Sequence, residues 1–439
     1  MLHTLRYLIR LSFAFVKRFK GLIFGGILIG IILFLIFGFL GPKFMGKSVK
    51  RIGITGRYHS DSLPRNIQEM IGKGLTSVND SGEVAPDLAK KWETPDKGKT
   101  WIFTLNDNIY WQDKTLITSK DINYNFSDVE IEKPDDKTII FKLKDKFSPF
   151  PSVVSQPIFK KGLLGAGDWK IQDIILSGSF VQQINIEKKK EKQIIRFYPT
   201  EETSKNAFKM GKVDILEDLY NPTPFIDWKT VRVIKTWDKN LIVTLFFNTQ
   251  DPILSEKTLR QALFYAINKN FDGPRAISPI SQYSWAYNPQ VKTYDFDQKR
   301  AKEIIDALPE EAKVDLKINL VSAPVLLPIA EKIAQDWKNA GIDSQILVSS
   351  VIPQDFQAYL AIFEIPKDPD QYAIWHSTQE STNISNYKNP RIDKLLEDGR
   401  AELDLNQRRS IYLDFQRFLL EDVPAAFLYN PSTYQIVRK

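Results

Sequence analysis

An unbroken apolar run near the start of the chain constrains the rest of the molecule most strongly. The run begins at Gly21, ends at Leu40 and reads GLIFGGILIGIILFLIFGFL, without a charged residue. A helix of this length spans roughly 30 Å, which is the thickness of the hydrocarbon layer of a bilayer. Because only internally hydrogen-bonded backbone is tolerated there, the run predicts a transmembrane helix, which we assign to residues 21–41.

A cleaved secretory signal is the alternative interpretation of this run. Such a signal has a shorter apolar core and small residues at the cleavage site, whereas Lys43, Phe44 and Met45 follow here. We therefore expect the helix to stay as a membrane anchor. The chain contains no cysteine, so neither a lipidated cysteine nor a disulfide framework is available. The helix itself must then be the tether.

The basic charge of the chain is confined to the membrane flanks. The formal net charge is +7, but residues 1–51 contain nine lysines and arginines and no acid, which leaves residues 52–439 at −2. Residues 1–20 mix apolar and basic side chains, as is typical of a segment on an anionic inner leaflet, and predict a cytoplasmic leader. The large remaining part has no basic bias, and we expect no binding of nucleic acid.

Several chemistries are not supported by any motif. The three histidines, His3, His59 and His376, are far apart in sequence, so no metal site is expected. The glycine-rich stretch at residues 162–167 lacks the lysine and hydroxyl residues of a phosphate loop. A serine elbow and recognisably spaced catalytic carboxylates are also missing. We predict no enzyme activity, no catalytic residue and no cofactor.

Periodicity predicts a mixture of short strands and helices. Residues 88–92, after Pro86, fit one face of a short helix, and residues 101–105 alternate like a half-buried strand. Ser119 is placed to cap a helix that extends to Phe126. These elements predict a small α+β lobe.

The second half of the chain has longer apolar elements. Residues 241–248 are almost continuously apolar, as expected for a strand buried on both faces. Residues 314–321 and 344–348 read as strands on either side of an amphipathic helix at 330–340. A strand, helix, strand order of this kind requires parallel strands.

Several segments, in order, resemble the family 5 extracellular solute-binding proteins, which serve oligopeptide, dipeptide and nickel ABC importers. Residues 71–122 are similar to the opening of that family, and the similarity covers about residues 67–432. The other matching segments are LRQALFYAINKN from Leu259, PISQYSWAYNP from Pro279, the Asp-Pro-Asp loop at residues 368–370, and the closing segment from Ser385.

The resemblance implies an α/β, two-lobed periplasmic-binding-protein-like fold of type II with a reduced extra α+β lobe, preceded by the single transmembrane helix. The extra lobe is expected to be trimmed because the chain passes from Phe126 to Thr138 where the family has tens of residues more. The expected divisions are a cytoplasmic leader at 1–20, a transmembrane helix at 21–41, lobe I at 42–74 and 147–238, trimmed lobe II at 75–146, lobe III at 239–432, and a return strand to lobe I at 433–439.

The resemblance also places the candidate ligand-binding residues. Trp285 and Tyr287 lie on an irregular segment, where ligands are contacted, although Trp285 could equally pack the lobe. Peptide-binding members have an aspartate for the ligand's amino group four residues before the loop proline; this chain has Ile365 there, beside Glu364. An ammonium group would lack a counter-charge unless Glu364 turned inward, because neighbours on a strand face opposite sides. The full candidate set is Trp111, Tyr265, Trp285, Tyr287, Phe363, Glu364, Ile365, Tyr372, Trp375 and Tyr429.

Two functions remain open at this point. The first is a membrane-anchored binding protein that captures a peptide or other small polar solute between hinged lobes for the permease subunits of an ABC importer. The second is a degenerate binding domain that acts as a membrane-bound interaction or sensor module without transport. In both cases the family implies a single-pass protein of the cell membrane with a large extracytoplasmic C-terminal domain.

Overall fold

The computed structural model describes residues 17–22, 25–26, 29–30, 48–310, 316–353 and 355–439. Most of the predicted transmembrane helix and of the basic leader lies outside these residues; the described parts, 17–22, 25–26 and 29–30, are helical. Within the described residues, no helix has both the length and the apolar character needed to cross a membrane. The chain divides into one unit of residues 1–50 with 189–192 and a second unit of residues 51–188 with 193–439.

A seven-stranded mixed sheet has the strand order β12-β18-β11-β1-β10-β9-β8. β1 is parallel to β11, while the last strand of the chain, β18, is antiparallel to both β11 and β12. Helices α2 (Arg65–Ile71) and α4 (Glu201–Lys209) and the turn η2 (Phe225–Asp227) accompany this sheet. Its strands are β1 (Ser48–Thr55), β8 (Lys170–Ser177), β9 (Phe180–Lys188), β10 (Glu191–Tyr198), β11 (Ile215–Leu219), β12 (Val231–Trp237) and β18 (Ser432–Arg438).

A four-stranded antiparallel sheet of order β4-β5-β7-β6 has its own aromatic core. A hairpin of two short strands, the turn η1 and the short helix α3 accompany it. The elements are β2 (Thr76–Val78), β3 (Val84–Pro86), β4 (Ala89–Glu93), β5 (Thr100–Leu105), η1 (Ser119–Asp121), β6 (Val129–Glu132), β7 (Thr138–Leu143) and α3 (Phe150–Val153).

Two predicted helices in this region are not formed. The segment after Pro86 is the strand β4, because it pairs with β5, where Trp92 lies opposite Phe103. Downstream of Ser119 only one turn of 3-10 helix forms, closed by Thr118 and Asp121. Tyr124 and Phe126 then continue without helical structure and stack on each other at 5.5 Å. In both places tertiary contacts override a local pattern that also fits a helix.

The third large sheet has five strands in the order β15-β14-β16-β13-β17 and a hydrophobic core on each face. β14 is parallel to β15 and β16, which confirms the predicted parallel pair, and β13 is antiparallel to β16 and β17. β13 is covered on both faces, as its apolar sequence predicts. The strands are β13 (Leu241–Phe247), β14 (Lys317–Ser322), β15 (Asp343–Val348), β16 (Ala358–Glu364) and β17 (Ala425–Tyr429).

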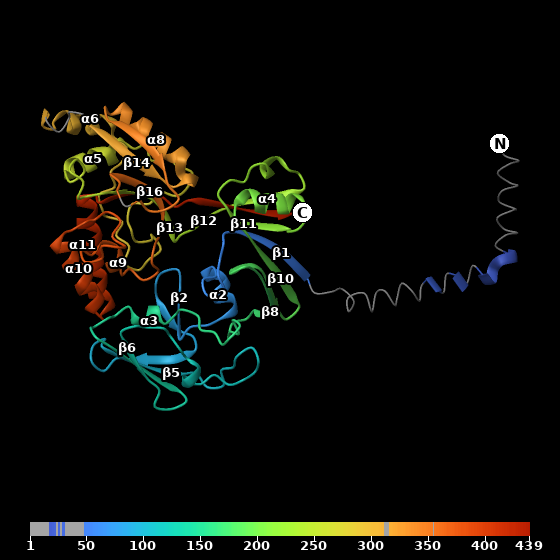
Figure 1. Cartoon of the computed structure of the whole chain (residues 1–439). Helices are drawn as coiled ribbons and strands as arrows, with labels where there is room; N and C mark the ends of the chain where they lie inside the picture. Colours follow the sequence, from blue (N-terminus) through green and yellow to red (C-terminus); the bar gives the residue numbers. More distant parts are fainter. Residues whose placement is uncertain (1–16, 23–24, 27–28, 31–47, 311–315, 354) are drawn as a thin grey trace, which may run out of the picture. The chain divides into compact units, whose positions relative to one another are not determined.

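Helices cover both faces of this sheet (Figure 1). One face packs against α5 (Lys257–Ala266), α6 (Gln298–Asp306) and α8 (Leu327–Asn339), which η3 (Pro324–Leu326) precedes. The other face packs against α9 (Tyr372–Trp375), α10 (Pro390–Ala401) and α11 (Leu405–Asp422). Alternate residues of β13 supply the two cores, Val243 and Leu245 to the first and Ile242 and Phe246 to the second.

The chain passes between the seven-stranded and the five-stranded sheets twice. The first passage, residues 238–240, joins β12 to β13, and the second, residues 430–431, joins β17 to β18. The two passages lie side by side, since the Asn430 side chain donates a hydrogen bond to the Leu241 carbonyl at 2.7 Å. Paired connections between two sheets are the usual place of a hinge.

Candidate functional site

A cavity of about 780 Å³ lies beside the first of these passages, and we call it the central cleft. Its wall comes from α2, from the bulged end of β11, from residues 238–241, from the end of α3 and from the segment after β16. The cleft therefore joins residues of all three sheet regions, and its volume is typical of sites that bind small molecules.

The cations of the central cleft are already paired. The Arg65 guanidinium lies 2.8 Å from a Glu69 carboxylate oxygen, and the Lys367 ammonium lies 3.7 Å from the same oxygen. Arg65 also donates to the Ser155 hydroxyl at 3.0 Å. Glu69 thus offsets one of the two positive charges on this wall.

Three carboxylates of the cleft have no such partner. Among the residues that the structure describes, no cation lies within 4.0 Å of Asp218, Asp238 or Glu364. Asp238 accepts only the backbone N–H of Asn240, at 2.8 Å. These three side chains give the cleft negative charge that is not offset by an ion pair, which favours a cationic group.

Asp218 owes its place to an irregularity in β11. The pairing with β18 shifts register between Leu216 and Leu219, and Asp218 has a left-handed backbone with φ 56°. A β-bulge of this kind re-aims a side chain. Burial in the cleft raises the pKa of Asp218 above its ordinary value, and the charge of Asp238 raises it further. A bound cation would relieve both effects.

The sequence predicts that Glu364 and Ile365 face opposite sides of a strand, and the structure differs from this prediction. β16 ends at Glu364, so the strand alternation no longer applies to Ile365, and both residues line the cleft. Ile365 is only 3% exposed and packs into the core beside Trp375, with its N–H bonded to the Asn240 carbonyl at 2.6 Å. Glu364 is exposed. The cleft consequently has carboxylates available although the predicted aspartate position holds isoleucine.

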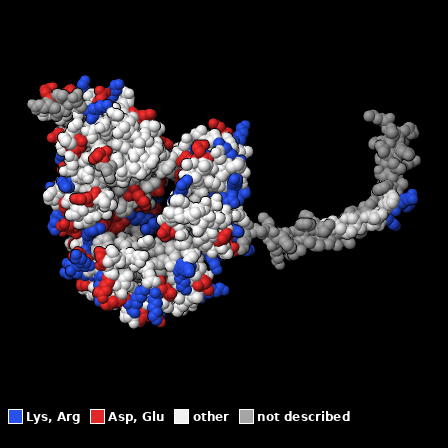
Figure 2. Space-filling view, viewed as in Figure 1, with Lys and Arg blue, Asp and Glu red and all other residues white. Residues whose placement is uncertain are grey.

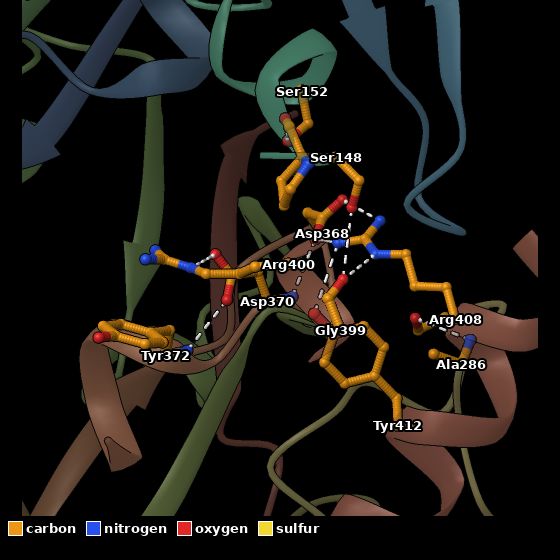
Figure 3. A network of polar contacts seen from close by, with 12 residues as sticks. Ser148, Ser152, Ala286, Asp368, Asp370, Tyr372, Gly399, Arg400, Arg408 and Tyr412 are labelled. Carbon is orange, nitrogen blue, oxygen red and sulfur yellow. Dashed lines mark hydrogen bonds and ion pairs between the residues drawn. The ribbon is translucent and has the colours of Figure 1, made fainter. Parts of the chain in front are cut away.

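The Asp-Pro-Asp loop is held by two arginines from α10 and α11 (Figure 3). Arg408 contacts both oxygens of Asp368, at 2.6 and 3.0 Å, and Arg400 contacts Asp370 at 2.9 Å. Both carboxylates also accept backbone N–H groups of the loop, at 2.9 and 3.1 Å. These ion pairs give the two aspartates a structural role and fix the cleft wall at Asp368.

The remaining sequence candidates lie in different surroundings. Trp285 lines a cavity next to the cleft, and Tyr372 lines another, beside Arg400. Phe363 and Tyr287 are half-buried. The other four are core side chains that are 6% exposed or less, namely Trp111, Tyr265, Trp375 and Tyr429. Their neighbours are the four-stranded sheet for Trp111, Tyr294 for Tyr265, Phe246 for Trp375 and Phe271 for Tyr429.

Sequence reasoning missed the charged residues of α2 and of the passages. Arg65, Glu69, Asp218 and Asp238 come from segments that are far apart in the chain. Asp238 carried a usable signal, because it closely precedes the buried strand β13 of the five-stranded sheet.

In the described parts of the chain, no three histidine or acidic side chains are grouped closely enough to hold a metal ion. Acidic and basic side chains are interspersed over the face shown in Figure 2.

Comparisons with known proteins show what the chain is similar to. The family model described as "Bacterial extracellular solute-binding proteins, family 5 Middle" matches residues 83–129 and 185–382. The oligopeptide-binding protein AppA of Bacillus subtilis is 24% identical over 86% of this chain and 84% of its own length. The dipeptide-binding protein of Escherichia coli is 24% identical over 81% and 83%. NikZ from Campylobacter jejuni, solved in complex with Ni(L-His), superposes with a TM-score of 0.73 at 20% identity, covering 90% of this chain and 95% of NikZ.

Proposed function

The chain belongs to the bacterial extracellular solute-binding proteins of family 5, and on this premise we propose that it captures a peptide with a free amino group in the central cleft. The peptide would pass to the permease subunits of an ABC importer. Relatives named for oligopeptide and dipeptide binding support the ligand class. The observation that carries the proposal is that three carboxylates without an ion-pair partner, Asp218, Asp238 and Glu364, line the cleft.

An ammonium group suits the cleft better than an anion or a neutral polar group. A cation that loses its water on entering the cleft needs a charged partner, and the three carboxylates supply one without disturbing an existing ion pair. Arg65 and Lys367, the cations of the cleft, share the Glu69 carboxylate, which offsets one of their two charges and weakens the attraction for an anionic ligand.

Native mass spectrometry of the full chain, purified in mild detergent from its own host, tests the ligand class. We expect an additional mass that dissociates on activation and that fragments as a peptide. The physical reason is that a ligand enclosed between hinged sheets leaves slowly, so part of it survives purification. A bound molecule without an amino group would contradict the proposal.

We further propose that residues 21–40 hold the protein in the cell membrane with the large domain outside. The uncharged apolar run supports this anchor. Intact mass of the protein from isolated membranes should include the first residues of the chain, and a mature start near Lys43 would contradict retention.

Protease added to intact cells, with the outer layers opened where necessary, should remove the large domain. Full protection would require the opposite orientation.

A further inference from the structure

A second cavity, of about 410 Å³, adjoins the central cleft, and we call it the tryptophan pocket. Ser152 and Asp368 line both cavities, so the two meet at these side chains. Figure 3 shows Ser152 and Ser148 near the ion pair of Asp368 and Arg408. The volume lies within the range of pockets that hold small organic groups.

Three tryptophans line the tryptophan pocket. Trp92 and Trp285 are half-buried, whereas Trp101 is only 4% exposed and belongs to the core of the four-stranded sheet. Trp92 and Trp101 come from β4 and β5, and Trp285 comes from a loop that precedes α6. Pro149 and Pro151 add further apolar surface. Large planar apolar walls favour a ligand group that is itself planar and apolar.

Existing contacts hold these rings in place. The Trp285 backbone N–H donates to the Ser81 carbonyl at 3.0 Å, at the tip of the β2–β3 hairpin. A neighbouring glycine, Gly82, allows this contact, since it has φ +84° and a Cβ there would lie 2.4 Å from the Lys367 carbonyl oxygen. The Trp101 indole N–H donates to the Gly98 carbonyl at 3.2 Å. These contacts restrain two of the pocket's three tryptophans, which lowers the entropy lost when a ligand binds.

Two leucines at the pocket are exposed. Leu403 is 39% exposed and Leu405 is 51% exposed, and both line the pocket where α10 gives way to α11. Exposed apolar side chains at the rim of a concave site gain free energy when a ligand covers them. A bound apolar group would cover this rim.

The polar side chains of the pocket are already bonded. Asp368 and Arg408 satisfy each other, and the Ser148 and Ser152 hydroxyls donate to the carbonyls of Gly399 and Pro149 at 3.3 and 2.8 Å. Glu83 and Glu402 complete the wall and each accept a hydrogen bond within their own loop. Neither has a cation partner among the described ion pairs, and Glu83 is exposed, so water screens its charge. The Arg408 guanidinium lies 5.5 Å from the Trp285 ring.

We propose that the tryptophan pocket receives an aromatic side chain of the peptide bound in the central cleft. This assignment rests on the peptide capture proposed above. The backbone of the peptide would stay in the cleft with its amino group at the carboxylates. One side chain would pass between Ser152 and Asp368 to pack against the accessible surfaces of Trp92 and Trp285. The pocket thereby makes the protein selective for peptides with aromatic residues.

Calorimetric titration of the full chain in detergent with Ala-Ala, Ala-Phe and Phe-Ala tests the pocket. We expect one of the two phenylalanine peptides to bind at least about tenfold more tightly than Ala-Ala. Trp92→Ala should abolish most of this gain while leaving the affinity for Ala-Ala nearly unchanged. Leu405→Ser, at an exposed position, should reduce the gain without risk to folding. Trp228→Ala, at a tryptophan that is 36% exposed and lines neither cavity, is the matched control and should keep the full gain.

The outcomes separate the pocket from the cleft. If Ala-Ala binds and phenylalanine adds nothing, the pocket assignment is wrong while peptide capture stands. An undiminished gain in both Trp92→Ala and Leu405→Ser also overturns the assignment. Competition of tetramethylammonium with the phenylalanine peptide, but not with Ala-Ala, would make the pocket a cation cage instead. If none of the three peptides binds, both proposals fall.

Discussion

Replacement of Arg408 by leucine is expected to lower the free energy of unfolding by about 3–5 kcal/mol, the usual effect of removing one partner of a buried ion pair. The side chains of Arg408 and Asp368 are 8% and 11% exposed, and two N–H groups of the arginine contact the two carboxylate oxygens. The substitution leaves the Asp368 charge buried without its partner. It also removes the bond from Arg408 Nε to the Gly399 carbonyl at 2.9 Å.

Denaturant unfolding of the full chain, followed by tryptophan fluorescence, measures this change. Arg409→Leu is the control, because Arg409 is exposed one position further along α11 and should change the stability by less than about 0.5 kcal/mol. The double substitution of Arg408 and Asp368 by leucine should recover part of the loss, since no unpaired charge remains. A loss below about 1 kcal/mol in Arg408→Leu would show that water or a neighbouring group compensates Asp368.

Helices and strands are predicted correctly from the sequence where the local pattern of apolar residues fits only one type of element. The strand β13 and the amphipathic helices α5 and α8 are examples, because the spacing of their apolar residues matches the residues that are buried. The segment from Leu88 to Trp92 has two readings, since the same spacing of apolar residues fits a helix and an edge strand. The strand forms because β5 offers it a ladder of hydrogen bonds, and that partner is not visible locally.

The candidate site is less predictable from sequence, for two physical reasons. Aromatic residues serve cores as well as binding sites, so Tyr265 and Trp375 carry the same local signal as Trp285 although they are buried in cores. Charged residues become a site only when the fold joins them. Asp218 reaches the cleft through a bulge and a left-handed backbone that aspartate adopts infrequently, and nothing in its neighbouring residues announces that conformation.

The largest expected effect on binding follows from the double substitution Asp218→Asn and Asp238→Asn. We expect it to weaken the binding of a free dipeptide by roughly 10- to 100-fold, which corresponds to the loss of one charged hydrogen bond of about 1.5–3 kcal/mol. The asparagines keep the size of the side chains but remove the negative charge that faces the cleft. Calorimetric titration with a free dipeptide and with its N-acetylated form measures the difference, because the acetylated form has no ammonium group to lose a partner.

The acetylated peptide and Glu364 decide how the result is interpreted. An equal loss for both peptide forms would mean that the two aspartates support the shape of the cleft and do not bind the amino group. If the double variant binds the free peptide normally and Glu364→Gln does not, the counter-charge comes from the end of β16 alone.

Acidification provides an independent check without substitution. Because the pKa of Asp218 is raised, this carboxylate becomes neutral at a higher pH than an ordinary aspartate, so the affinity for the free peptide should fall earlier as the pH is lowered. In the variant with both aspartates replaced, that early fall should disappear, since neither asparagine titrates.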